Sequence, residues 1–247
     1  VPLTDQEFDQ VKMQLQFATF YDAAQWLVGE NGIAKVRVQR EDAALGTISL
    51  QVINNKEING GTSSYEVINQ FQAKRQKGMD RDRRFDVTLL INGLPMIHIE
   101  LKNRNHPFMD GFRQIKKYIA EGKFRGLFSC VQIFVVSNGS DTRYIAAAMD
   151  TKLKEQFLTK WVDKENTPVI NYIDFAAQVL RVPEAHHLIA DYTVLDNERK
   201  SIIVLRPYQI HAIKAIRQAS ARQQSGYVWH TTGSGKTLTS YKVARNL

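Results

Sequence analysis

Cysteine is nearly absent from this chain of 247 residues, in which Cys130 is the only one. A single thiol can form no disulfide within the chain and cannot build a multi-thiolate metal site. Long apolar runs are missing as well, since no stretch approaches the roughly 20 residues that a membrane-spanning helix needs. The chain also opens without a signal peptide. These absences favour a protein of the reducing cytoplasm with no membrane partner.

Acidic residues are fewer than basic ones, with 25 Asp and Glu against 33 Lys and Arg, so the formal net charge is +8. Such an excess favours a polyanionic partner through counterion release. Charge alone does not separate a nucleic acid from an anionic membrane surface, or either of them from a merely soluble basic protein. Hydrophobic residues make up 43% of the chain, which is enough for one or two domains with a substantial core.

Hydrophobic spacing predicts alternating helices and strands, which is typical of an α/β fold. The opening "TDQE" matches a capping box, with Thr4 as the N-cap, and predicts one helix to roughly Trp26. A further helix is expected over 109–122, and strands are expected over 35–39, 46–53, 65–72, 127–139 and 142–149. From about residue 150 we expect longer amphipathic helices, at 152–161 and 171–182.

One predicted hairpin carries charges that a core hairpin should avoid. "FDVTLLINGLPMIHIELK" consists of two apolar strands around Asn-Gly, with Asp86 near its start and Glu100 and Lys102 at its end. Metal-assisted phosphodiester hydrolysis needs hard oxygen ligands for Mg²⁺ and a group that orients or activates water. Asp86, Glu100 and the carbonyl of Leu101 could be the ligands. Lys102 shares a strand face with Glu100 and could hold the water.

The register of the hairpin tests this idea. A strict two-residue turn would pair Asp86 with Ile99 and turn Glu100 to the opposite face. We therefore predict an irregularity that brings Asp86 opposite Glu100, either a three-residue loop over 92–94 or a bulge near Pro95.

Asp86 followed by Glu100-Leu101-Lys102 resembles the PD-(D/E)xK nuclease motif, and the wider text resembles the nuclease domain of type I restriction enzyme R subunits. Gln114 and Tyr118 resemble the Gln-x-x-x-Tyr motif of that family, which implies that they orient the catalytic lysine or the scissile DNA. They are one helical turn apart and so lie on one helix face. Phe85 stands where the motif usually has proline. Many related nucleases carry a further acid on the first helix, and Glu7 or Glu30 could fill that role.

A phosphate-loop motif follows at 230–237, "HTTGSGKT", between "GYVW", a predicted strand, and "LTSYKVARNL", a predicted helix. Glycines allow close backbone approach, and N–H groups at a helix N-terminus cradle phosphates. Lys236 should reach the β- and γ-phosphates of ATP, and Thr237 should bind Mg²⁺. The predicted nucleotide-binding residues are Thr232, Gly233, Ser234, Gly235, Lys236 and Thr237.

The segment resembles superfamily 2 helicases, in which a histidine such as His230 also replaces the first glycine of the loop. "LRPYQ" at 205–209 resembles their adenine-recognition element, with Gln209 on the adenine edge; an ordinary helix start is the alternative. The second half of such a motor is missing, so we expect these residues to be a piece of a longer polypeptide that binds nucleotide weakly by itself.

Several other residues invite a simpler interpretation. His98 is expected on the face away from Glu100, with a structural role, and His186-His187 is expected at the surface. Cys130 and the tryptophans Trp26, Trp161 and Trp229 are expected to pack. The basic run "AKRQKGMDRDRR" over 73–84 is either a solvated loop or a loop that contacts phosphate.

The sequence thus predicts an endonuclease domain over 1–150, a helical connector over 151–200 and the start of a RecA-like motor domain over 201–247. The resemblance implies Mg²⁺- and ATP-dependent cleavage of double-stranded DNA, in complex with methyltransferase and specificity subunits. One alternative is a DNA translocase or repair helicase whose nuclease-like domain only binds DNA. Another is a module that docks onto the methyltransferase core.

Overall fold

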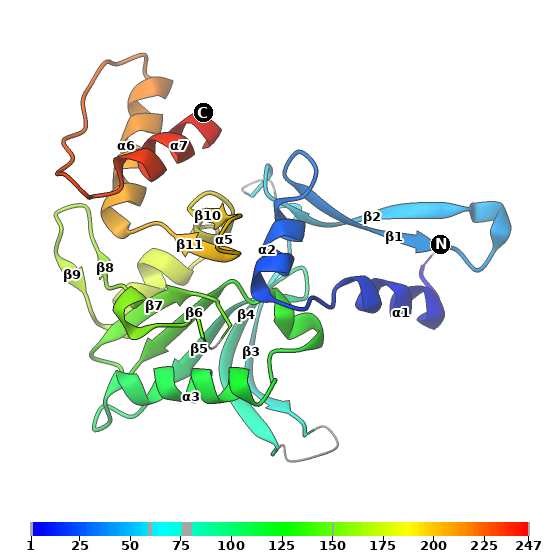
Figure 1. The fold of residues 1–247 in the computed structure, drawn as a ribbon. Coiled ribbons are helices and arrows are strands. Elements are labelled where there is room, and N and C mark those ends of the chain that lie inside the picture. Colours follow the sequence, from blue (N-terminus) through cyan, green and yellow to red (C-terminus); the bar gives the residue numbers. More distant parts are fainter. Residues whose placement is uncertain (1, 59–60, 76–80, 150, 247) are drawn as a thin grey trace.

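The computed structural model describes residues 2–58, 61–75, 81–149 and 151–246 (Figure 1). Its first part is two helices, α1 (Asp5–Gln14) and α2 (Phe20–Val28), and not the single helix predicted to Trp26. Thr19 is a second N-cap, whose hydroxyl accepts the N–H of Asp22. The N–H of Phe17 donates to Ser129 Oγ at 3.0 Å, which turns the chain between the two helices. The capping box at Thr4 is present as predicted.

Strands β1 (Ile33–Gln39) and β2 (Thr47–Asn54) form an antiparallel hairpin that projects from the body together with α1 (Figure 1). Both strands were predicted. The side chains of Gln10 and Gln14 bond to backbone groups of Gln39 and Arg37, which fixes α1 along β1.

The body is a five-stranded sheet in the order β3-β4-β5-β6-β7, antiparallel except where β5 pairs with β6. Helix α3 (Phe108–Ala120), which was predicted, is the crossover between these two parallel strands and covers one face of the sheet (Figure 1). The expected strand at 127–139 is wrong in its first part, because a 3₁₀ helix occupies Gly126–Cys130. The strands are β3 (Tyr65–Ala73), β4 (Arg83–Ile91), β5 (Leu94–Leu101), β6 (Ile133–Ser137) and β7 (Thr142–Ala146).

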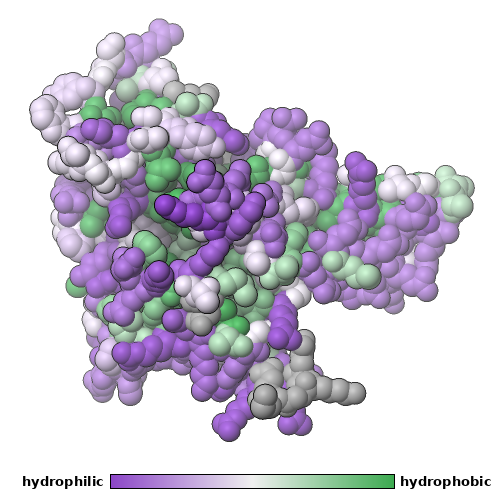
Figure 2. Space-filling view, in the orientation of Figure 1, coloured by the Kyte–Doolittle hydropathy of each residue, from purple (hydrophilic) through white to green (hydrophobic). Residues whose placement is uncertain are grey.

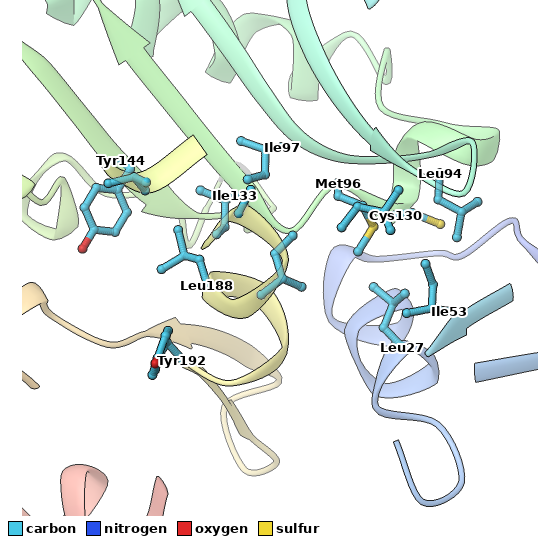
Figure 3. Packing of buried hydrophobic residues seen from close by; sticks show 14 of the residues in the cluster. Leu27, Ile53, Leu94, Met96, Ile97, Cys130, Ile133, Tyr144, Leu188 and Tyr192 are labelled. Atoms are coloured by element: carbon cyan, nitrogen blue, oxygen red, sulfur yellow. The ribbon is translucent and has the colours of Figure 1, made fainter. Parts of the chain in front are cut away.

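Hydrophobic cores lie on both faces of this sheet. On the α3 face, Phe112 and Ile115 pack with Phe134. On the other face, Ile97 and Ile133 pack with residues of the later chain such as Leu188 (Figure 3). Cys130 belongs to that second core, as predicted, and burial raises the pKa of its thiol to about 12.

The later chain is mixed, so the expectation of a helical connector holds only in part. Instead of a helix at 152–161 there is one 3₁₀ turn, and Thr159 forms a backbone bridge with Tyr144 at the edge of the sheet. The helix expected at 171–182 is present as α4 and a π-helical turn over Ala176–Leu180. The elements are β8 (Trp161–Val162), β9 (Pro168–Val169), α4 (Tyr172–Phe175), α5 (Glu184–Ala190), β10 (Thr193–Asp196), β11 (Ser201–Val204), α6 (Pro207–Ala221) and α7 (Lys236–Asn246).

Hydrophilic residues cover most of the face shown in Figure 2. Among the described residues, no helix combines the length and the apolar character needed to cross a membrane.

Candidate functional site

The β4–β5 hairpin contains the predicted irregularity. Ile91 pairs with Leu94 across the two-residue turn Asn92-Gly93, but the register shifts between Leu89 and Leu90. Leu90 pairs with Pro95, whereas Val87 pairs with Ile99, so the bulge near Pro95 is the observed solution. One residue beyond the pair of Val87 and Ile99, the same register places Asp86 opposite Glu100.

Asp86 and the end of β5 are also linked directly. The N–H of Leu101 donates to Asp86 Oδ2 at 2.9 Å. Glu100 is fully buried, and its Oε1 lies 3.0 Å from Lys102 Nζ. The two carboxylates and the lysine therefore meet where the hairpin strands end.

Helix α3 holds the lysine from the other side. Lys102 Nζ donates to Gln114 Oε1 at 2.6 Å, and Gln114 Nε2 donates to the hydroxyl of Tyr118. The Tyr118 hydroxyl in turn donates to the carbonyl of Arg84 on β4. Burial, and then the negative charge of Glu100, raise the pKa of Tyr118, so its phenol stays protonated near neutral pH and remains a donor.

These residues suit a hard divalent cation. Asp86 and Glu100 offer carboxylate oxygens, and Glu100 Oε2 is buried without a hydrogen-bond partner. Among the residues that the structure describes, no group of three or more His, Cys, Asp or Glu side chains is arranged to hold a metal ion, so the carboxylates of this site are those of Asp86 and Glu100. Leu101 is 41% exposed at the end of β5, where its carbonyl was expected to be a further ligand.

Neither candidate for an additional acid joins this group. The Glu7 carboxylate accepts hydrogen bonds from the Thr4 and Glu41 N–H groups and from Arg40, which lower its pKa. Its role is therefore to cap α1 and fix it to the end of β1. Glu30 forms an isolated backbone bridge with Ile33 before β1.

His98 lies on the same face of β5 as Glu100, so the expectation of opposite faces was wrong. Residues two apart on a strand share a face. His98 Nε2 lies 3.5 Å from Glu100 Oε2, and both side chains are fully buried. That burial agrees with a structural role and not with a general base.

The basic run predicted at 73–84 is split between elements. Residues 76–80 lie outside the described part of the chain. Arg83 and Arg84 belong to the start of β4, and Arg83 forms two hydrogen bonds with the carboxylate of Glu121 after α3.

The phosphate loop leads directly into α7, which begins at Lys236. Gly233 and Gly235 have φ of 77° and 81°, values that suit glycine. The Ser234 hydroxyl donates to Thr231 O and lies 3.0 Å from His230 Nδ1, which closes the loop on itself.

The strand expected for "GYVW" is wrong. Strand structure needs a neighbour for its backbone groups, and no described residue pairs with 226–229. Trp229 is 87% exposed, so its expected packing role is wrong as well, whereas Trp161 is buried as expected. Trp26 is partly buried, and its ring lies against Phe17.

The "LRPYQ" segment contacts the phosphate loop. Gln209 accepts the N–H of Arg206 at 2.8 Å and donates to the carbonyl of Gly235 at 3.2 Å. The Tyr208 hydroxyl donates to the carbonyl of Ser234 at 2.9 Å. Helix α6 thus holds two carbonyls of the loop, and the N–H of Ser234 donates to the carbonyl of Thr231 at 3.3 Å. A pocket of about 420 Å³ lies beside the loop and is lined in part by Val228, His230, Lys236 and Thr239.

His186 is fully buried, which overturns its expected surface position. Its Nδ1 lies 2.9 Å from the hydroxyl of Tyr65 on β3, and its Nε2 lies 3.0 Å from Asn55 Oδ1. Burial lowers the pKa of His186 to about 4, so the ring is neutral. Sequence reasoning missed this contact because the partners lie more than 120 residues away along the chain.

The far end of α5 contacts the helix of the phosphate loop. Lys242 Nζ donates to the carbonyl of Ala190 at 3.4 Å, and Asn246 Nδ2 donates to the carbonyl of Asp191 at 3.1 Å. Arg217 of α6 lies 3.5 Å from Asp191. Helix α5 therefore bonds to the central sheet near one end and to α6 and α7 at the other.

Comparison with known proteins gives consistent matches. Residues 3–153 match the family described as "Type I restriction enzyme R protein N terminus", and residues 202–247 match "Type III restriction enzyme, res subunit". The type I restriction enzyme SsaAORF53P endonuclease subunit of Staphylococcus saprophyticus is 34% identical over 249 residues, covering 100% of this chain and 25% of the relative. The SauCOLORF180P endonuclease subunit of Staphylococcus aureus has the same identity and coverage.

A third relative, the EcoprrI endonuclease subunit of Escherichia coli, is 37% identical over 154 residues, which cover 61% of this chain and 48% of that subunit. The chain spans about a quarter of the length of the staphylococcal relatives. Taken together with the hairpin and the phosphate loop, these matches mean that the chain belongs to the type I restriction enzyme R protein family, of which it carries the N-terminal region.

Proposed function

We propose that this chain contributes the nuclease centre and the start of the ATP-driven motor of a type I restriction endonuclease that cleaves duplex DNA. The observation that carries the proposal is the contact chain Glu100–Lys102–Gln114–Tyr118 beside Asp86. Residues 1–150 are the nuclease domain in this proposal, 151–200 the connector and 201–247 the beginning of the motor. The partners are DNA and the methyltransferase and specificity subunits.

Each residue of the nuclease site has a role that its contacts support. Mg²⁺, when bound, supplies Lewis acidity and lowers the pKa of water. Asp86, Glu100 and the carbonyl of Leu101 would hold the ion. Lys102 would hold the attacking water and stabilise the negative charge that develops on the phosphate.

Gln114 and Tyr118 are positioning residues in this scheme. Gln114 accepts from Lys102 at 2.6 Å, which directs the ammonium group toward Glu100. The Tyr118 hydroxyl accepts a hydrogen bond from Gln114, its neighbour on α3, and donates one to the carbonyl of Arg84 on β4.

The phosphate loop would bind ATP through its backbone and Lys236. The backbone of Thr232, Gly233, Ser234 and Gly235 would line the phosphates, and Thr237 would hold the accompanying Mg²⁺. Gln209 contributes by fixing the loop through Gly235, and its contact with the adenine edge stays a prediction from the resemblance.

The test is nicking of supercoiled DNA by the full-length subunit with its partner subunits, Mg²⁺ and ATP. Lys102→Met should abolish cutting and leave ATP hydrolysis intact, because it removes the ammonium group and keeps the side-chain length. Lys236→Ala should abolish ATP hydrolysis. Lys164→Met is the matched control, since Lys164 is 81% exposed and outside both sites.

Normal cutting by Lys102→Met would reject the nuclease assignment and favour a translocase with a DNA-binding, non-cleaving domain. Absence of cutting by the wild type, with partner-subunit binding that survives Lys102→Met and Lys236→Ala, would instead favour a module that docks onto the methyltransferase core.

A further inference from the structure

Two buried polar atoms face each other behind the nuclease site and have no other partner. His98 Nε2 and Glu100 Oε2 lie 3.5 Å apart, and neither forms a hydrogen bond with the described residues. Both side chains are 0% exposed. An unpaired polar atom in such a place costs free energy, so a pair of them side by side calls for a reason.

Strand β4 fixes the other nitrogen of the imidazole. Thr88 pairs directly with His98 across the hairpin, and its buried hydroxyl lies 3.3 Å from His98 Nδ1. If the hydroxyl donates to Nδ1, the proton of the neutral ring must sit on Nε2, which faces Glu100.

Aromatic rings enclose the histidine on its remaining sides. The ring centroids of Phe85, Phe124 and Phe134 lie 4.7, 5.3 and 6.2 Å from that of His98. This environment leaves Glu100 as the one polar neighbour on the Nε2 side among the described contacts. A histidine that served packing alone would not need a carboxylate there.

We propose that His98 is a positioning residue of the nuclease site: held by Thr88 as the Nε2–H tautomer, it donates to Glu100 Oε2 and orients that carboxylate for the metal. The inference rests on the proposed function, because it assigns Glu100 as a metal ligand. Glu100 is then held at both oxygens, by Lys102 at Oε1 and by His98 at Oε2. Groups that hold metal ligands in this way typically contribute about 10- to 100-fold in metal affinity.

The experiment is a Mn²⁺ titration of the full-length subunit without nucleotide, followed by the electron paramagnetic resonance signal of free Mn²⁺. In His98→Met the new side chain fills the space among Phe85, Phe124 and Phe134 but has no N–H to donate to Glu100. This variant should weaken Mn²⁺ binding about 10- to 100-fold. His98→Gln places an amide N–H near the position of Nε2 and should restore most of the affinity. Thr88→Val removes only the hydroxyl that fixes the tautomer and should give a smaller loss.

Asp86→Asn distinguishes failure of the proposed metal site from failure of the role of His98. Its amide oxygen can still accept the N–H of Leu101, but the negative charge that would bind the metal is lost. Unchanged Mn²⁺ binding in Asp86→Asn would overturn the proposed metal site itself. Weak binding in Asp86→Asn with wild-type binding in His98→Met would overturn only the role of His98. Equal losses in His98→Met and His98→Gln would also overturn it, and unchanged thermal unfolding without metal confirms that each variant is folded.

Discussion

At the residue scale, the hydroxyl of Tyr118 connects α3 with β4, since it accepts from Gln114 and donates to the carbonyl of Arg84. Tyr118→Phe keeps the buried ring and removes both bonds. Gln114 then loses its support, and Lys102 is less well placed. In the proposed nuclease we expect DNA cleavage to slow by about 10- to 100-fold, as misplacement of a catalytic group does.

Single-turnover DNA cleavage at saturating Mg²⁺ and ATP measures this effect. Tyr172→Phe is the matched control, because Tyr172 is 43% exposed at the start of α4. Equal rates for Tyr118→Phe and wild type would show that Gln114 orients the lysine without the tyrosine.

Two pairs of neighbours in this group could be predicted because the spacing within each pair is local. Glu100 and Lys102 share a strand face, and Gln114 and Tyr118 share a helix face. His186 could not be predicted, because its burial depends on Tyr65 and Asn55, which no local pattern relates to it. His98 was placed on the wrong face, although the two-residue period of a strand was sufficient to place it beside Glu100.

At the element scale, the turn of the β4–β5 hairpin also fixes the neighbouring strands. Asn92 has φ of 50°; its Oδ1 accepts the N–H of Ser64, and its Nδ2 donates to the carbonyl of Val52, each at 2.7 Å. Asn92→Gly keeps the turn geometry and removes both bonds. The free energy of unfolding should fall by about 1 to 3 kcal/mol.

Urea unfolding followed by circular dichroism measures this loss. Gly93→Ala is the paired variant, because Gly93 has φ of 78° and a Cβ there would meet nothing within 4 Å. Gly93→Ala should lower the free energy of unfolding by only about 1 kcal/mol, which is the cost of a positive φ for a residue that has a Cβ. A smaller loss in Asn92→Gly than in Gly93→Ala would contradict the anchoring role of the asparagine.

Most elements could be predicted from periodicity, and the exceptions share a cause. The bulge near Pro95 followed from the requirement that Asp86 and Glu100 meet. The chain breaks between α1 and α2 where the N–H of Phe17 bonds to Ser129 Oγ. Residues 226–229 do not form a strand because no described strand pairs with them. A contact distant in sequence breaks the first helix, and the lack of one leaves 226–229 without strand structure; hydrophobic spacing carries no information about either.

At the scale of the whole molecule, α5 joins the central sheet to the phosphate-loop helix through His186 and through Ala190 and Asp191. The neutral state of His186 makes this link sensitive to acid. Its pKa is lowered to about 4 by burial, then by the charge of His187, against an opposing effect of Asp191.

The sign of the pH effect follows from these values. As pH falls from about 6.5 to about 4, the unfolded chain takes up a proton on this histidine that the folded chain does not. The free energy of unfolding should therefore fall, by about 2 kcal/mol between about pH 7.5 and about pH 5. His186→Gln should remove that part of the pH dependence, which urea unfolding at both pH values measures. His106→Gln is the control, since His106 is 63% exposed and far from this contact in the sequence. An unchanged dependence of the unfolding free energy on pH in His186→Gln would contradict the assignment.

The contacts of Lys102 determine when its side chain loses rotamer entropy. A free lysine side chain carries about 2 kcal/mol of rotamer entropy, which a disordered site would lose only when DNA binds. Here Glu100 and Gln114 already restrain the ammonium group, and Tyr118 restrains Gln114. The side chain is ordered when the chain folds, so in the proposed nuclease the binding energy from DNA would remain available to lower the barrier to cleavage.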